Sequence, residues 1–147
     1  MVSKVSILFN ETSYENSIIE LFKNMEYEYV YGPNIERDFR CPFYESELDI
    51  ALSRINVSKP LSAIQAAIYK LKNIENASLV QKNTVFMDYL QNGISINYYD
   101  GDEEKSDIIY LIDYLNIKNN SFIIANQWTF IENSEKRPDV ILFLNGL

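Results

Sequence analysis

Histidine is absent from this chain, and cysteine occurs only once, as Cys41. Without histidine, no Ser-His or Cys-His nucleophilic pair can form within these residues. A single cysteine excludes an internal disulfide and a multi-cysteine zinc site. A metal held by this chain must therefore be bound by carboxylate and carbonyl oxygens, which suit magnesium or calcium better than zinc.

Long apolar runs and basic clusters are also scarce. The longest apolar runs, such as residues 140–144, are far shorter than the roughly 20 residues that a membrane-spanning helix needs. Residues 1–10 hold one lysine and no cleavage-site pattern, so we predict a cytoplasmic protein with no membrane partner. The net charge is −8 and the basic residues are scattered, so we expect the isolated chain to bind DNA weakly.

The 147 residues, 47% of them hydrophobic, are enough for one domain with a real core. Apolar residues at helical spacing, with capping residues before them, predict helices in the first two thirds of the chain, and alternating or continuous apolar runs predict strands after them. The expected helices cover about residues 13–25, 45–55, 58–71 and 77–90, and the expected strands cover 94–99, 107–115, 121–131 and 139–144. Residues 27–42 are expected to be irregular, with a turn at Gly32-Pro33-Asn34.

This order predicts an α/β (α+β) fold with the sheet late in the chain. The last expected strand is nearly all apolar, which favours burial on both of its faces. It is followed only by Asn145-Gly146-Leu147, so the chain is expected to stop inside a sheet.

Four collinear stretches carry a family resemblance. They read YEYVYGPNIERD (27–38), SLVQKN with FMDYLQNG (78–93), YLIDY (110–114), and NSF through NQWTFIENSEKRPD (120–139). Together they resemble the N-terminal region of the DNA-cleaving R subunit of type I restriction enzymes, over about residues 9 to 147.

The resemblance implies a PD-(D/E)xK restriction-endonuclease-like core. Within it, residues 27–92 would be a mostly helical insertion and residues 94–147 would be strands of the nuclease sheet. The aspartate of Pro138-Asp139 matches the first catalytic and metal-binding carboxylate of the family. The Glu-x-Lys that follows on the next strand is not in this sequence, so the core is expected to be truncated before its sheet is complete.

The same resemblance implies an activity for the parent protein. The reaction would be Mg²⁺-dependent hydrolysis of duplex DNA, coupled to ATP-driven translocation and to modification and specificity subunits. No Gly-x-x-x-x-Gly-Lys loop occurs in these residues, so ATP would bind elsewhere in the full-length protein. We expect this chain alone to be inactive, and the alternative is an inert truncated product or a docking module of the restriction complex.

Glu15 is the second carboxylate that we predict to be catalytic and metal-binding. The family carries a glutamate on its first helix, where this chain offers Glu15 and Glu20. At about 100° per residue, Glu15 lies at the edge of the apolar face near Ile19 and Phe22, whereas Glu20 lies almost opposite that face. The alternative is a surface glutamate favoured by the helix macrodipole.

Three further features receive an ordinary structural interpretation. The charged residues 36–38 suggest a local salt-bridge network, with a role in shaping the site or contacting DNA as the alternative. Trp128 lies in an apolar run and is predicted to pack in the core rather than to stack on bases. The acidic residues between 100 and 104 lack a calcium-loop pattern and indicate a solvated hairpin tip.

Overall fold

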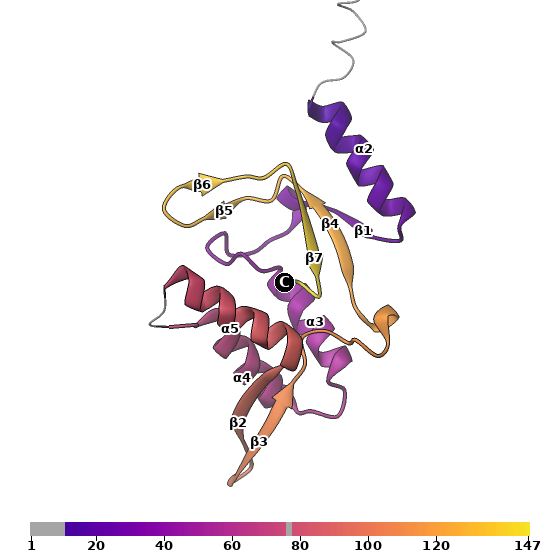
Figure 1. Cartoon of the computed structure of the whole chain (residues 1–147). Helices are drawn as coiled ribbons and strands as arrows, with labels where there is room; N and C mark the ends of the chain where they lie inside the picture. The colour runs from indigo at the N-terminus through magenta and orange to yellow at the C-terminus, as the bar shows by residue number, and fades with distance from the viewer. Residues whose placement is uncertain (1–10, 76–77) are drawn as a thin grey trace, which may run out of the picture. The chain divides into compact units, whose positions relative to one another are not determined.

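The computed structural model describes residues 11–75 and 78–147, which form helices and small sheets in a mixed α/β arrangement (Figure 1). The chain divides into two compact units. The described residues up to Glu45 together with Phe122–Leu147 make the first unit, and Ser46–Ser121 make the second. No helix of the described ranges is both long and apolar enough to cross a membrane.

The first unit is built on a three-stranded sheet in the order β1-β4-β7. Its elements are α2 (Glu11–Asn24), β1 (Glu28–Tyr31), the 3-10 helix η1 (Gly32–Asn34), β4 (Phe122–Asn126), β5 (Phe130–Ile131), β6 (Glu135–Lys136) and β7 (Val140–Leu144). Strand β1 runs parallel to β4, with Glu28 opposite Ile123. Strand β7 runs antiparallel to β4, with Asn126 opposite Val140.

Strand β4 is central because its side chains are apolar on both faces. Ile123, Ile124 and Ala125 are fully or almost fully buried, as expected for a continuous apolar strand. The core of this unit consists of Ile123, Ala125, Trp128 and Phe143, with Val30, Ile35, Tyr44 and Ile141 packed against it. The rings of Trp128 and Phe143 meet edge to face, with their centroids 4.7 Å apart. Helix α2 packs on β1 and β4, where Ile19 is its buried residue.

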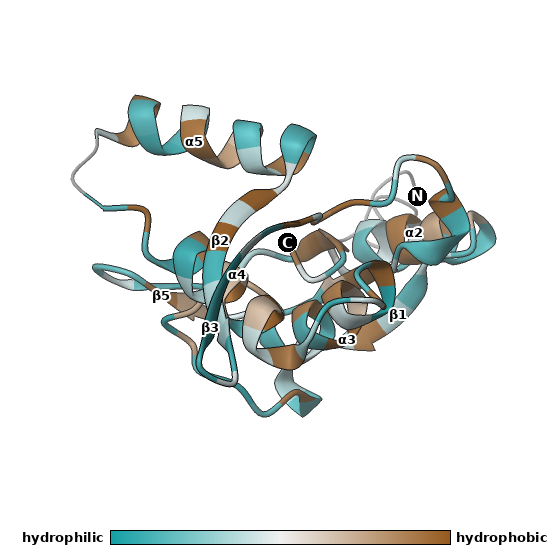
Figure 2. Cartoon of the chain, turned by 90° about the horizontal axis from the view of Figure 1, so that it is seen from below, coloured by the Kyte–Doolittle hydropathy of each residue, from teal (hydrophilic) through white to brown (hydrophobic). Residues whose placement is uncertain are grey.

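The second unit combines helices with a separate hairpin. Its elements are α3 (Glu45–Ile55, which begins at the unit boundary), α4 (Leu61–Lys72), α5 (Leu79–Asn92), β2 (Ile94–Asp100), β3 (Glu103–Ile109) and the 3-10 helix η2 (Ile117–Asn119). Strands β2 and β3 pair antiparallel from Ile94 opposite Ile109 to Asp100 opposite Glu103. Helix α4 packs against β2. Helix α5 alternates apolar and polar residues (Figure 2) and has no buried residue.

The four predicted helices are confirmed with small shifts at their ends. Helix α5 begins at Leu79 rather than 77, because Ser78 and Gln81 form a reciprocal capping box. Two strands end earlier than the sequence predicts. The expected strand 107–115 is β3, which ends at Ile109. The expected strand 121–131 is interrupted after Asn126, because Gln127 adopts a positive φ of 53° that cannot continue a strand.

The prediction that residues 94–147 supply the strands of one sheet is wrong. Among the described strands, β2 and β3 pair only with each other, and β1, inside the expected insertion 27–92, joins β4 instead. Strand β1 has only four residues and ends at the predicted Gly32-Pro33-Asn34 turn, and Val30 packs it against the core. Strand β7 is also not buried on both faces: it is an edge strand among the described residues, and Leu142 is 44% exposed.

Candidate active site

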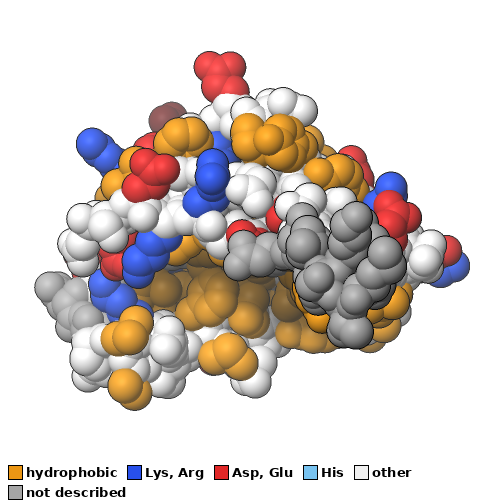
Figure 3. Space-filling view, turned by 90° about the horizontal axis from the view of Figure 1, so that it is seen from above, with side chains coloured by type: hydrophobic (Ala, Val, Ile, Leu, Met, Phe, Trp, Pro, Cys, Tyr) orange, Lys and Arg blue, Asp and Glu red, His pale blue; other side chains and the backbone are white. Residues whose placement is uncertain are grey.

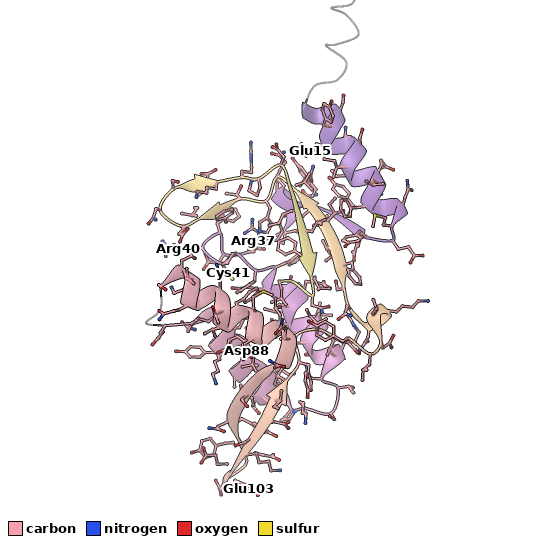
Figure 4. All side chains as sticks on the ribbon, in the orientation of Figure 1. Glu15, Arg37, Arg40, Cys41, Asp88 and Glu103 are labelled. Atoms are coloured by element: carbon pink, nitrogen blue, oxygen red, sulfur yellow. The ribbon has the colours of Figure 1, made fainter. Side chains whose placement is uncertain are left out.

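Helix α2 places Glu15, not Glu20, against the end of β4. Asn126 donates its Nδ2–H to Glu15 Oε1 over 2.7 Å, and Gln127 Nε2 lies 3.3 Å from each carboxylate oxygen. Glu15 is half-buried and projects from α2 toward this end of the sheet (Figure 4). Glu20 is exposed and pairs instead with Lys23 at 3.2 Å. The side of the helix chosen by the helical count is therefore the side that meets the sheet, while the metal role of Glu15 remains a prediction.

Asn126 is held from two sides. It is the last residue of β4, is 9% exposed, and accepts a hydrogen bond on Oδ1 from the Tyr29 hydroxyl over 2.9 Å. Because its oxygen is taken by a donor, its amide nitrogen must face the carboxylate of Glu15. Tyr29, Asn126 and Glu15 thus form a hydrogen-bonded relay between β1, β4 and α2.

Gln127 connects this relay to Asp139. Its backbone N–H donates to the carbonyl of Asp139 over 3.1 Å, while its side chain reaches Glu15. The backbone of Gln127 is left-handed, with φ 53°, a conformation that is uncommon for a residue other than glycine. Glu15 and Asp139, far apart in sequence, are therefore both bound to the same residue.

Gly32 allows the chain to come this close. A Cβ at Gly32 would lie 2.6 Å from the carbonyl oxygen of Asn126 and 2.7 Å from that of Gln127. Both contacts are with backbone atoms, so any side chain here would push the end of β4 away. The glycine of η1 is thus a packing requirement of the site.

Asp139 is exposed and immediately precedes β7. The predicted start of a strand after this residue is confirmed, and among the described strands this one, β7, lies at the edge of its sheet. The carboxylates of Asp139 and Glu15 are hard oxygen donors, which fit Mg²⁺, a cation usually held through one or two carboxylates with water and phosphate oxygens. Among the residues that the structure describes, no group of three or more acidic, cysteine or histidine side chains gathers as a metal cluster.

Arg37 corrects the interpretation of residues 36–38. Within the described ranges it forms no ion pair; its guanidinium lies 3.7 Å from the ring centroid of Trp128 and donates to the carbonyl of Thr129. Its Nε and Nη1 are buried without a partner, and burial lowers the pKa of Arg37, against a smaller opposing effect of Cys41. The residue folds back onto an aromatic ring, as a planar cation does, instead of pairing with its acidic neighbours.

The two other ordinary interpretations are confirmed. Trp128 is fully buried in the core. At the β2–β3 tip, Asp100 accepts a hydrogen bond from Lys105 over 2.9 Å on the surface. On the face shown in Figure 3, lysine and arginine side chains are mixed with aspartate and glutamate, in keeping with the net charge of −8.

Four residues of the site were not predicted from the sequence: Tyr29, Gly32, Asn126 and Gln127. One signal was present: two consecutive amide residues, Asn126 and Gln127, directly follow the apolar run Phe122–Ala125. Polar side chains at the end of a buried strand often serve a site at the edge of the sheet. The tyrosine and the glycine carry no such local signal, because their partners lie more than ninety positions away.

Comparison with known proteins gives a family match over most of the chain. Residues 8–147 match the family described as type I restriction enzyme R protein N terminus. A Methanocaldococcus jannaschii protein whose name describes an endonuclease subunit of the type I restriction enzyme MjaIXP is 31% identical over 146 residues, with 90% of this chain and 14% of that protein covered. The type I restriction enzyme HindI endonuclease subunit of Haemophilus influenzae is 25% identical over 150 residues, again with 14% of its length covered.

Proposed function

This chain belongs to the family of type I restriction enzyme R protein N termini, and we propose that it forms the N-terminal part of a magnesium-dependent nuclease domain acting on duplex DNA. The observation that carries the proposal is the binding of both predicted carboxylate residues to Gln127: its side chain reaches Glu15 and its backbone holds Asp139. Because the relatives are endonuclease subunits and the chain spans only 14% of their length, the activity proposed is that of the parent protein.

In this proposal the chain supplies two oxygen ligands. Asp139 and Glu15 would hold Mg²⁺, which, when bound, supplies a Lewis acid for the scissile phosphate and lowers the pKa of an attacking water. Asn126 and Gln127 keep the Glu15 carboxylate in place through neutral amide donors, so its negative charge is not cancelled by a cation. ATP-driven translocation and contacts with modification and specificity subunits would belong to the rest of the parent protein.

A turn at the end of β7 supports a PD-(D/E)xK core. Asn145 and Gly146 both have positive φ, 55° and 83°, as a type I′ hairpin turn requires. Leu144 and Leu147 exchange backbone hydrogen bonds of 3.4 and 3.0 Å across it. Any chain that continues beyond Leu147 therefore starts back along β7. Asp139 lies five positions before Leu144, so the position five beyond Leu147 would face it, which is where a Glu-x-Lys strand would complete the site.

The activity test uses the full-length parent protein that contains these residues, in a plasmid-cleavage assay with Mg²⁺, ATP and its partner subunits. We expect Asp139→Ala and Glu15→Gln to abolish or strongly reduce cleavage, because each removes a ligand, while Glu20→Gln on the exposed face of α2 retains it. Full cleavage by the Asp139→Ala protein would overturn the proposal.

The 147-residue chain alone is expected not to nick plasmid DNA, even with Mg²⁺ and ATP. The proposed site in these residues has two carboxylates, Glu15 and Asp139, and lacks the Glu-x-Lys lysine that would stabilise charge on the phosphate. The net charge of −8 also disfavours DNA binding. Nicking that needs Mg²⁺ and disappears in Asp139→Ala would show that these residues already hold a complete site.

The rival function is an inert product or a docking module of the restriction complex. The exposed position of Asp139 favours it over an enclosed catalytic centre. The coding sequence after the Leu147 codon discriminates between the two: an in-frame apolar strand ending in Glu-x-Lys supports the nuclease, whereas a stop codon supports the rival.

A further inference from the structure

We propose that Tyr29, Asn126 and Gln127 are positioning residues that aim the Glu15 carboxylate at a divalent cation. The inference rests on the proposed nuclease function and adds to it the residues that set the geometry of one ligand. None of the three is a metal ligand in this proposal. They act through Glu15, and the structure provides three independent observations for that role.

The first observation is that the orientation of the Asn126 amide is fixed. The Tyr29 hydroxyl donates to Asn126 Oδ1 over 2.9 Å, and Asn126 Nδ2 donates to Glu15 Oε1 over 2.7 Å. A flipped amide would face the hydroxyl with its nitrogen and the carboxylate with its oxygen, which would place two oxygens in contact. The Glu15 carboxylate, which only accepts, therefore fixes Asn126 with its nitrogen toward Glu15, and the Tyr29 hydroxyl donates to the oxygen on the other side and holds the amide there.

The second observation is the uneven use of the two carboxylate oxygens. Oε1 receives Asn126 at 2.7 Å and Gln127 at 3.3 Å, whereas Oε2 receives only Gln127, at 3.3 Å. Each carboxylate oxygen offers about two acceptor positions. Among the described residues, Oε1 thus receives two amide donors and Oε2 receives one. The amides present one defined oxygen, rather than either of two, to an incoming cation.

The third observation is the backbone conformation at Gln127. Its φ of 53° is left-handed, a conformation that is strained for a residue other than glycine. Glycine would be the residue of choice for stability alone. The side chain at this position instead reaches both oxygens of Glu15. A strained residue whose side chain holds the carboxylate fits a functional role better than a purely structural one.

The experiment uses NMR to measure the binding of Mn²⁺ to the 147-residue chain. Mn²⁺ is a paramagnetic probe of the proposed divalent-cation site. The side-chain amide signals of Asn126 and Gln127 report on a cation at Glu15, and weak binding can be followed by titration. Tyr29→Phe removes one hydroxyl from the relay, and Tyr31→Phe on the same strand is the matched control. Gln127→Gly removes the side chain and relieves the left-handed backbone. Melting followed by Trp128 fluorescence checks the fold of each variant.

In wild type we expect saturable broadening of both amide signals that is lost in Glu15→Gln. Tyr29→Phe should weaken Mn²⁺ binding by about 2- to 10-fold, the effect of one hydrogen bond, and Tyr31→Phe should leave it unchanged. Gln127→Gly should bind Mn²⁺ more weakly although it melts no lower than wild type, a combination that a merely structural role does not produce.

Two failures are distinguishable. Absence of localised broadening in wild type would overturn this inference, while the nuclease proposal is judged separately by cleavage in the Asp139→Ala parent protein. Broadening that depends on Glu15 but has the same affinity in Tyr29→Phe and Gln127→Gly would leave the nuclease proposal standing and overturn the positioning role.

Discussion

Gly32→Ala is the sharpest test of how the first unit brings the site together. The added methyl group would lie 2.6 Å from the carbonyl oxygen of Asn126 and 2.7 Å from that of Gln127. Neither oxygen belongs to a flexible side chain, and both strands are tied by the parallel pairing of β1 with β4. The backbone must therefore separate, and this movement displaces the amides that hold Glu15.

The size of the effect follows from the clash. Overpacking a well-packed position typically costs about 1–3 kcal/mol, and two backbone contacts at once place this substitution near the upper end. For a chain of this size the corresponding fall in melting temperature is about 4–12 °C. Trp128, the single tryptophan, is fully buried in the first unit, so its fluorescence follows the unit that the substitution disturbs.

Gly101→Ala provides the contrast. A Cβ at Gly101 meets no atom within 4 Å, and only its φ of 66° opposes alanine. We expect the left-handed backbone to cost alanine about 1–2 kcal/mol and the Trp128 transition to stay unchanged, since Gly101 lies in the second unit. A Gly32→Ala protein as stable as wild type, with unshifted NMR signals for Asn126 and Gln127, would refute the close approach from which the site geometry is argued.

Three further outcomes test the second unit. The pKa of Asp107 is lowered first by a hydrogen bond from Lys59 (2.7 Å) and then by one from the backbone N–H of Ile108. The stability that this carboxylate contributes is complete above its unfolded-state pKa of about 4 and is lost as the pH falls through its lowered folded-state pKa. Acid titration of Lys59→Met against wild type measures the difference, and equal pH profiles would contradict it. Asn56→Ala should cost about 1–3 kcal/mol in urea unfolding, because Asn56 bonds both the N–H and the carbonyl of Tyr110 at 2.9 Å; a neutral result would mean that water replaces both bonds. Ser78→Ala should cost about 1 kcal/mol by removing the cap of α5, and amide exchange confined to the first turn of that helix would show it.

Local signals in the sequence predicted the helices well. Helix α3 has the predicted bounds, and α5 is shifted by two residues toward its capping box. These elements depend on spacing and capping, which a reader can find within one segment. The helical count also selected Glu15 over Glu20, because it placed Glu15 beside Ile19 and Phe22, which are buried and half-buried in the structure. The other apolar residues of the predicted helix 13–25, Tyr14, Ile18, Leu21 and Met25, are exposed.

Strand pairing was harder to predict because it depends on distant partners. Strand β1 has a local signal, since Tyr29-Val30-Tyr31 ends at the Gly32-Pro33-Asn34 turn. Its partner β4 begins only at Phe122, so no local pattern reveals the pairing. The hairpin β2–β3 alternates apolar and polar residues as an exposed strand pair does, and nothing in its sequence indicates that it does not pair with β4. Gln127 ends β4 through a left-handed backbone that the apolar context does not suggest.

The composition of the chain explains why neutral amides surround Glu15. A lysine or arginine in the place of Asn126 or Gln127 would pair with the carboxylate and cancel the charge that a divalent cation needs. Amide N–H groups stabilise and orient the same carboxylate without adding positive charge. In a chain without histidine and with a net charge of −8, this arrangement keeps the end of β4 anionic. Arg37, which follows η1, is turned onto the ring of Trp128 and the carbonyl of Thr129, so its charge is engaged there.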